Sequence, residues 1–315
     1  MELVSQNRTN VRTACRLFGH CHQAYYQFKS DFQEERHKEA EIVQSVKEIR
    51  EEDPGIGAFK LFLMIAVLFG KDCMPGRDAF FRILRKNKLM LKRPRPRHTT
   101  NSNHRFHKYK NMVRGFTPDA ANQMWVSDIT YIDLDTGPCY LHLITDAYSH
   151  KIVGWRLSDS LKASVSIEAL NDAVAQAGGG DLVGLVHHSD RGIQYCCDAY
   201  VDVLRAHNIT ISMTEDYKPT DNAIAERVNG IIKMERVYKR HRFSDIDEAR
   251  SVIGRFIVFY NDVRPHMSIG YKTPSQVHDE SGPQKKMWNP KIYPSKNSKS
   301  AEKDVTLPAE KKKGR

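Results

Sequence analysis

Three acidic residues lie in local sequences that could bring them together for chemistry. Asp128 falls inside the strand-like run WVSDITYI, and Asp190 ends a second such run, LVGLVHHSD. Glu226 falls in the first turns of the helix-like run DNAIAERVNGIIK, with 35 residues between it and Asp190. Carboxylates repel one another when they are gathered, so a fold that clusters three of them normally does so around divalent cations. Two strands and a helix that carry these acids therefore predict a two-metal phosphoryl-transfer site.

Each acid also has an ordinary structural interpretation. Asp128 could keep an edge strand soluble, Asp190 could form a turn, and Glu226 could be a favourable charge at the start of a helix. The spacing alone decides little, because 38 of the 315 residues are acidic. Asp146 is the strongest competing candidate, because it also ends a strand-like run. The three settings taken together favour the catalytic interpretation.

The order of elements around the acids predicts an α/β fold. Three strand-like segments are followed by alternating helices and strands and then by the helix of Glu226; the segments cover about 124–134, 139–146, 151–157, 162–177, 182–188, 198–206 and 209–213. This order predicts an RNase H-like mixed sheet, in which parallel strands extend three antiparallel ones and helices flank both faces. Asp128 would project from the central strand, and Asp190 would stand at the carboxyl end of its neighbour. Gly192 would allow a tight turn beyond Asp190.

The N-terminal third is helical by pattern. A first amphipathic helix ends at Gly19, a second, short helix carries Tyr25 and Phe28, and a separate helix covers about 36–51. Helix, glycine turn and helix predict a helix-turn-helix DNA-binding element, and an ordinary helical hairpin is the alternative. The run KLFLMIAVLF at 60–69 is too short to cross a bilayer and predicts a buried helix, so we expect no membrane partner.

A second helix-turn-helix is predicted after the breaker Asp53-Pro54-Gly55. Its first helix would cover 58–69 and its recognition helix 76–87. The recognition helix would turn apolar side chains inwards and basic side chains towards DNA, among them Arg77, Arg82 and Arg85. A solvated basic face without a partner is the alternative.

Positive charge is concentrated in two segments. Residues 86–118 carry ten Lys or Arg and no acid, and residues 283–315 carry ten against three acids, while the whole chain is +11. Such segments favour contact with a polyanion, although a solvated linker and tail would have the same composition. The prolines of KRPRPRH keep the first segment extended, so we expect a linker that lies along DNA phosphates and becomes ordered on DNA. Its expected DNA contacts are Lys92, Arg93, Arg95 and Arg97.

The cysteines argue against disulfides and zinc. Six cysteines show no Cys-x-x-Cys pair, and the sequence shows no secretory leader, so we expect free thiols in a reducing compartment. The Cys and His residues around 15–22 and 187–197 lack the spacing of a tetrahedral zinc site.

Five strings between Trp125 and Val277 carry a resemblance to a known family. They are WVSDITYI, YLHLITDAYSHKIVGW, HHSDRGIQY, DNAIAERVNGIIKMER and YNDVRPHMSIGYKTPSQV. In this order and at these spacings, over about half of the chain, they resemble the DDE transposases of the IS3 type, in the retroviral-integrase-like group. The resemblance implies a DNA transposase that cleaves and joins insertion-sequence ends. Asp128, Asp190 and Glu226 would then be its catalytic and metal-binding residues, holding two Mg²⁺ for which Mn²⁺ can substitute.

The resemblance also implies DNA contacts and partners. The family carries a basic residue seven positions after its glutamate, and Lys233 matches that offset, with an ordinary surface lysine as the alternative. The family's serine and aromatic residue after the glutamate are replaced here by Arg227 and Val228. Expected partners are double-stranded DNA of the element ends and target, further copies of the chain, and an upstream-frame protein. The expected location is the bacterial cytoplasm, at the nucleoid.

We therefore expect five segments and weigh three functions. The segments are a helix-turn-helix-like region (1–52), a second such region (53–88), a basic linker (89–118), an RNase H-like integrase catalytic core (119–280) and a basic, disordered tail (281–315). A transposase is the first function. A structure-specific nuclease of RNase H type, which hydrolyses DNA without joining it, and a non-catalytic DNA-binding repressor are the alternatives.

Overall fold

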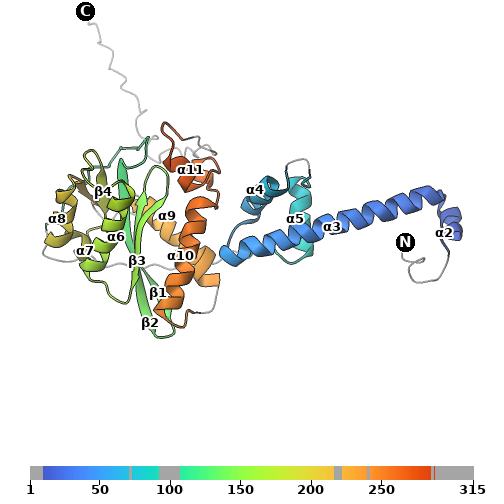
Figure 1. Ribbon diagram of the computed structural model, residues 1–315, viewed down its shortest axis with the longest axis horizontal. Coiled ribbons are helices and arrows are strands. Elements are labelled where there is room, and N and C mark those ends of the chain that lie inside the picture. Colours follow the sequence, from blue (N-terminus) through green and yellow to red (C-terminus); the bar gives the residue numbers. More distant parts are fainter. Residues whose placement is uncertain are drawn as a thin grey trace, which may run out of the picture.

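A helical arm and an α/β core make up the part of the chain that the computed structural model describes, residues 10–70, 73–91, 107–215, 222–239, 242–284 and 287 (Figure 1). The arm consists of α2 (Val11–Phe18), α3 (His22–Glu52), α4 (Ala58–Phe69) and α5 (Arg77–Lys86). The core consists of β1 (Met124–Leu134), β2 (Gly137–Asp146), β3 (Ile152–Ser158), α6 (Ala163–Gln176), β4 (Val186–Ser189), α7 (Ile193–Cys196), α8 (Asp198–Ala206), β5 (Thr210–Met213), α9 (Ala223–Ile231), the π-helix η2 (Ile232–Arg236), the 3₁₀ helix η3 (Val237–Lys239), α10 (Ile246–Asp262), the 3₁₀ helix η4 (Met267–Ile269) and α11 (Pro274–His278).

The centre of the core is a five-stranded mixed sheet in the order β3-β2-β1-β4-β5. Strands β1, β2 and β3 pair antiparallel, whereas β1, β4 and β5 pair parallel. The strands are rich in Val, Ile, Leu and aromatic residues, which suits a sheet covered on both faces. The predicted fold class, an RNase H-like mixed sheet with flanking helices and a helical N-terminal region, is confirmed.

Alternate residues of β1 face two separate hydrophobic clusters. Trp125 packs on one face of the sheet in a cluster with Tyr200 of α8. Ile132 packs on the other face in a cluster with Val228 of α9. Because side chains alternate along a strand, Asp128 points to the same face as Ile132, the side that α9 covers.

Three α-helices of the described core, α7, α10 and α11, were not predicted. The short α7 follows β4, and the 17-residue α10 packs on the sheet beside α9. Gly254 interrupts the helical pattern of α10 in the sequence. In the structure a Cβ at Gly254 would lie 3.3 Å from the ring of Trp155, so the glycine makes room for an aromatic side chain of β3. The predicted elements around the sheet otherwise lie within a few residues of their observed bounds.

The predicted break between two helices in the arm is wrong. Residues 22–52 form one continuous α-helix of 31 residues, rather than a short helix followed by another over 36–51. The intervening run KSDFQEERHK contains no glycine or proline, and its Lys, Gln, Glu and Arg residues favour helix. Glu34 and Lys38 add an ion pair across one turn. Helix α2 ends at Gly19, as predicted, with the glycine in the left-handed conformation at φ 68°.

The C-terminal half of α3 forms a small hydrophobic core with α4 and α5. Val46, Leu61 and Phe80 are fully buried in it, and Phe259 of α10 joins them from the α/β core. The prediction that the 60–69 run is buried holds for one face of α4 only, since Val67 is 84% exposed. No helix in the described part of the chain is long and apolar enough to cross a membrane.

Buried charges also hold the arm on the core. Arg264, which is 1% exposed, donates two hydrogen bonds of 2.7 Å to Glu235 of η2. Asp53, at the end of α3, lies 3.5 Å from Arg264, and Lys60 of α4 lies 3.7 Å from Glu235. Gly55 approaches so closely that an added Cβ would lie 2.2 Å from the Cα of Glu235. The arm therefore docks on the segment that follows α9.

Part of the predicted linker lies on the α/β core. The backbone N–H groups of Asn111 and Met112 donate to Glu215 Oε1 (3.0 Å) and Ser212 Oγ (2.9 Å). This segment therefore runs beside β5 at the edge of the sheet, and the expectation that it becomes ordered mainly on DNA is wrong for it. Residues 92–106 of the linker and 288–315 of the predicted tail lie outside the described residues.

Candidate active site

The register between β1 and β4 sets two of the three predicted acids side by side. The parallel pairing ends with Ser127 opposite Ser189, so the next residues, Asp128 and Asp190, follow on adjacent strands. Adjacent strands lie about 4.8 Å apart, and residues in register point to the same face. Both carboxylates therefore emerge on the α9 side of the sheet, where β4 ends.

Two asparagine amides fix α9 against β1 beside Asp128. Asn222 Nδ2 donates to the carbonyl oxygen of Ser127 (3.1 Å), and Asn229 Nδ2 donates to Asp128 Oδ2 (2.7 Å). Glu226 lies four residues after Asn222 and three before Asn229, so the three share one face of the helix. Glu226 is therefore presented towards the edge of the sheet that carries Asp128, and its side chain is exposed.

The pKa of Asp128 reflects the crowding of negative charge. Burial raises this pKa, the Asp190 carboxylate raises it further, and together they bring it to about 7 with a smaller contribution from Glu226. Hydrogen bonds from Asn229 and from the backbone N–H of Ile129 (2.9 Å) act in the opposite direction. The three acids are thus within electrostatic reach of one another, and a cation among them would relieve their repulsion.

Gly192 holds the carboxylate of Asp190. Its N–H donates to Asp190 Oδ1 at 2.9 Å, and a Cβ added to the glycine would lie 2.9 Å from the same oxygen. The φ of Gly192 is −64°, which any residue adopts. The glycine therefore lets the backbone approach the Asp190 carboxylate closely, and the predicted tight turn does not depend on a conformation special to glycine.

The carboxylate groups of the three acids are suitable ligands for a divalent cation, although the three side chains do not surround a single metal position. Within the residues that the structure describes, no three His, Cys, Asp or Glu side chains lie close enough together to hold a metal ion. Carboxylate oxygens are nevertheless the ligands that Mg²⁺ prefers. The structure brings Asp128 and Asp190 together and leaves Glu226 exposed at the same edge.

Lys233 lies close to the acids on the segment that continues α9. The helix runs directly into η2, which carries Lys233, and π-helical turns are frequent at functional sites. The ammonium lies 4.2 Å from the centre of the Tyr131 ring. Burial lowers the pKa of Lys233, while Tyr131 and Asp128 act against that shift. The lysine is therefore near enough to Asp128 to interact with its charge.

A buried polar network supports β1 on the opposite face from Asp128. Ser127 Oγ and Tyr200 OH both lie within hydrogen-bonding distance of His187 Nε2, at 2.7 and 2.9 Å. Burial lowers the pKa of His187 to about 3, so the imidazole is neutral. The network has a structural role, since it packs between the sheet and α8.

The competing acid, Asp146, is structural. It is fully buried and accepts hydrogen bonds from the backbone N–H groups of Asn122 and Ser149, so it shapes the turn after β2.

The two asparagines that position the site, Asn222 and Asn229, were not predicted. A polar residue on an amphipathic helix gives no sequence signal of a partner about 100 residues away.

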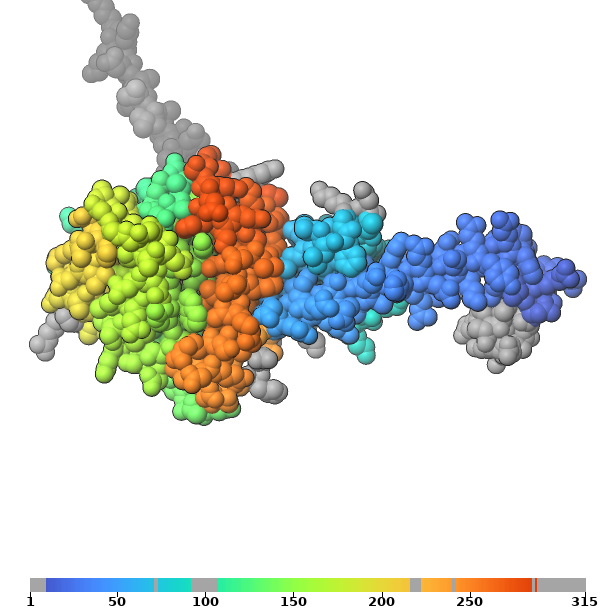
Figure 2. Space-filling model, viewed as in Figure 1, coloured from blue at the N-terminus to red at the C-terminus, as the bar shows by residue number. Residues whose placement is uncertain are grey.

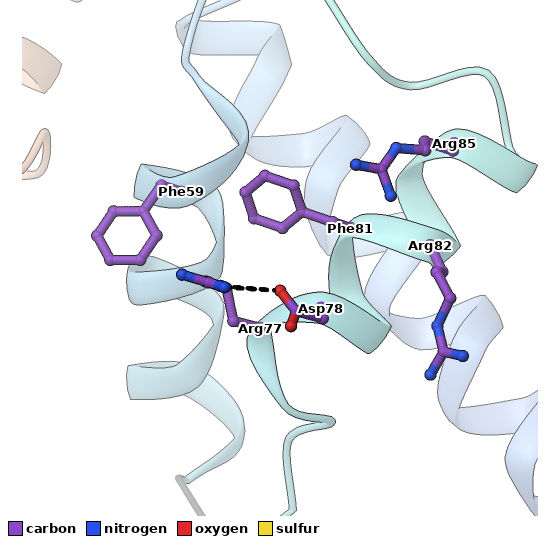
Figure 3. A pocket seen from close by; sticks show the side chains of 6 residues that line it. All are labelled: Phe59, Arg77, Asp78, Phe81, Arg82 and Arg85. Carbon is purple, nitrogen blue, oxygen red and sulfur yellow. Dashed lines mark hydrogen bonds and ion pairs between the residues drawn. The ribbon is translucent and has the colours of Figure 1, made fainter.

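Three predicted DNA-binding arginines of α5 line a pocket in the arm (Figure 3). The pocket has a volume of about 770 Å³ and is lined by Phe59, Arg77, Asp78, Phe81, Arg82 and Arg85. Arg77 pairs with Asp78 at 2.9 Å, and Arg82 and Arg85 are exposed. Guanidinium groups beside aromatic rings can bind both phosphates and bases of a nucleic acid. The other four predicted contacts, Lys92, Arg93, Arg95 and Arg97, lie outside the described residues.

Comparisons with known proteins agree with this architecture. Two family models, both described as Integrase core domain, match residues 118–219 and 207–274. The insertion element IS600 uncharacterized 31 kDa protein of Shigella sonnei is 35% identical over 208 residues, which cover 65% of this chain and 75% of that protein. Transposase InsF for insertion sequence IS3fB of Escherichia coli (strain K12) is 30% identical over 170 residues, 54% of this chain and 58% of InsF. Among solved structures, the HTLV-2 integrase catalytic core domain in complex with magnesium is 18% identical with a TM-score of 0.38, covering 50% of this chain and 97% of that one.

Fold and sequence together define a transposase with an integrase-type core, a class of polynucleotidyl transferase that acts on DNA. The chain belongs to the IS3 family of insertion-sequence transposases, which confirms the resemblance drawn from its five motifs.

Proposed function

We propose that this transposase cuts and joins the ends of its insertion sequence with Asp128, Asp190 and Glu226 as the catalytic, metal-binding residues. The observation that carries the proposal is the β1–β4 register, which sets Asp128 beside Asp190. Helix α9, anchored to β1 by two asparagines, supports the assignment of Glu226 as the third acid.

The chain's own residues prepare the carboxylates for cation binding. Asn229 orients Oδ2 of Asp128 and favours its ionised form, and the N–H of Gly192 orients Oδ1 of Asp190. Mg²⁺, bound as two ions that Mn²⁺ can replace, would lower the pKa of a water or a DNA 3′-hydroxyl and neutralise charge on the leaving oxygen. Hydrolysis and strand transfer then differ only in the nucleophile that attacks phosphorus, and no covalent protein intermediate is needed.

Positive side chains at three places would hold the DNA. Lys233, beside Asp128, would bind a phosphate next to the scissile bond. Arg77, Arg82 and Arg85 would bind the duplex along α5, and the basic linker would add contacts through Lys92, Arg93, Arg95 and Arg97. Contacts of this kind supply affinity and salt dependence, and they carry little sequence information.

The expected partners follow from the reaction. Joining two ends of one element requires double-stranded DNA of the ends and the target, and it favours more than one copy of the transposase. An upstream-frame protein that adds end recognition is a further proposed partner, on the family resemblance alone. The place of action would be the bacterial cytoplasm, at the nucleoid.

An assay with Mg²⁺ and labelled DNA carrying the ends of the element tests this function. Joined products support the transposase. Cleavage without joining would support the nuclease, and a salt-sensitive shift in DNA mobility with neither product would support the repressor.

A further inference from the structure

Arg236 of η2 is a buried cation that donates to backbone groups of the arm. It is 2% exposed, and its guanidinium donates to the carbonyl oxygens of Glu51 (2.6 Å) and Glu52 (3.2 Å). Both carbonyls belong to the last turn of α3, which ends at Glu52. The last carbonyls of a helix have no partner within the helix and form its negative end, so they compensate a buried positive charge. Figure 2 shows the end of α3, in light blue, against orange segments of the core.

The backbone carries this contact into the π-turn of η2. Val237, the residue after Arg236, donates its N–H to the carbonyl oxygens of both Ile232 and Lys233. The first bond has the spacing of a π-turn and the second has that of an α-turn. One peptide unit and one hydrogen bond therefore separate the anchored Arg236 from the backbone of Lys233.

Buried contacts hold both ends of the segment that runs from α9 through η2. At the α9 end, Asn222 and Asn229 donate to β1. At the η2 end, Glu235 accepts from Arg264, and Arg236 donates to the arm. A π-turn is wider than an α-turn and is rare in proteins. We expect it to persist here because its neighbours on both sides are held in place.

Lys233 lies within this π-turn and reaches the candidate active site. Its ammonium is 4.2 Å from the centre of the Tyr131 ring and interacts with the charge of Asp128. An α-helix turns about 100° per residue, so loss of the extra residue of the π-turn would rotate parts of η2 relative to α9 by up to that angle. Lys233 would then lose its place over Tyr131.

We propose that Arg236 is a positioning residue, which holds Lys233 at the active site by anchoring η2 to the end of α3. This inference rests on the proposed function, in which Lys233 binds a phosphate of the DNA. Helix α3 shares a hydrophobic core with α4 and α5, so the anchor belongs to the same body as the arginines of α5. The arm thereby contributes to the chemical step as well as to DNA binding.

A double-mutant cycle on single-turnover joining rates tests this role. Arg236→Met keeps a long side chain, removes its hydrogen bonds and should slow joining about 10- to 100-fold with DNA affinity unchanged. In a Lys233→Met background the same change should cost at most about twofold, because the lysine that it positions is gone. Arg255→Met is the matched control. Arg255 of α10 is exposed and lies 4.0 Å from Glu52 at the same end of α3, and its loss should leave joining unchanged.

Folding is checked on the same variants by circular dichroism and melting temperature, and joining is compared where all of them are folded. Arg236→Lys keeps the charge but loses the planar set of donors, so it should slow joining less than Arg236→Met does. If Arg236→Met does not fold, Arg236→Lys takes its place in the cycle.

Three results would overturn the positioning role. They are equal losses of joining with and without Lys233, joining at the wild-type rate by folded Arg236→Met, and a parallel loss of joining and DNA affinity. Asp190→Asn separates this inference from the proposed function. Joining by Asp190→Asn would overturn the function itself, whereas an additive cycle in a chain whose joining needs Asp190 would overturn the role of Arg236 alone.

Discussion

The side-chain amide of Asn229 on α9 donates a 2.7 Å hydrogen bond to Oδ2 of Asp128 on β1. This bond joins the strand that supplies one acid to the helix that supplies another, Glu226. It also favours the ionised form of Asp128, whose pKa is raised by burial and by Asp190. Asn229 is thus a positioning residue for the proposed site.

Replacement of Asn229 should slow joining without weakening DNA binding. We expect Asn229→Ala to reduce the rate of strand joining about 10- to 100-fold, because Asp128 loses the group that orients one of its oxygens. Single-turnover joining rates and a fluorescence anisotropy titration measure the two effects. Asn171→Ala, at an exposed asparagine of α6, is the control and should change neither. Equal losses of joining and of DNA affinity in Asn229→Ala would contradict the positioning role.

The sequence was sufficient for the sheet and for the places of Asp128 and Asp190 on neighbouring strands, and the reasons are local. Asp128 lies within one apolar run and Asp190 directly follows another, and the pairing of these runs is fixed once the strand order is known. The charges that hold the arm on the core could not be predicted in this way. Asp53, Glu235 and Arg264 are far apart in the sequence, and each is an ordinary charged residue until the fold buries it.

The continuous helix α3 shows a second limit of prediction from the sequence. The run between the two predicted helices, which includes Glu34 and Lys38, belongs to α3, because side chains of this kind stabilise a helix that stands in solvent. The exposed position of Glu226 shows a third, because a helix pattern identifies the face on which a side chain lies but does not fix its distance from the strands.

Gly55 should be indispensable for docking the arm. Gly55→Ala places a Cβ 2.2 Å from the Cα of Glu235, and backbone atoms cannot move away cheaply. We expect a loss of about 1–3 kcal/mol in the free energy of unfolding, measured by denaturant titration. Gly57→Ala is the control, since an added Cβ there meets no atom within 4 Å. Similar stability of the two variants would show that the arm does not pack on η2 as described.

Asp53 and Glu235 should respond to pH in opposite directions. Burial, together with the nearby charge of Glu235, raises the pKa of Asp53 to about 8, although Arg264 lies 3.5 Å away. Burial also acts to raise the pKa of Glu235, but the charge and the two hydrogen bonds of Arg264 outweigh it and lower that pKa. Arg264 therefore stabilises the ionised form of Glu235 more than that of Asp53.

The sign of the pH effect follows from these shifts. The native chain keeps a proton on Asp53 that the unfolded chain loses near pH 3.8, so through this residue stability falls as the pH rises towards 8. Asp53→Asn should remove this pH-dependent loss of stability. The melting temperature of the variant relative to wild type should therefore rise between pH 3.8 and about 8. Glu235→Gln should show the opposite trend, because ionised Glu235 stabilises the fold fully above pH 4.5 and this stabilisation is lost in acid. The melting temperature of this variant relative to wild type should therefore fall as the pH rises from acid towards pH 4.5. A deficit of Asp53→Asn that deepens towards pH 8 would contradict the assignment.

The arm arginines should contribute to DNA affinity through phosphates. Arg82→Ala combined with Arg85→Ala should weaken binding of duplexes of any sequence and reduce the slope of log affinity against log salt by about one per lost contact. Titrations at several salt concentrations measure this. Arg205→Ala, at an exposed arginine of α8, is the control. An unchanged slope in the double variant would mean that α5 does not bind DNA.

The most direct test of the catalytic proposal is strand joining by Asp190→Asn in Mg²⁺, measured alongside DNA affinity. The substitution keeps the size of the side chain and removes one of the two carboxylates that the β1–β4 register sets together. We expect cleavage and joining to fall by at least about 10³-fold while DNA affinity stays within about twofold, and Asp133→Asn, at an exposed acid of β1, to remain active. Joining by Asp190→Asn at the wild-type rate, or an equal loss of joining and DNA binding, would contradict the assignment of Asp190 to the metal site.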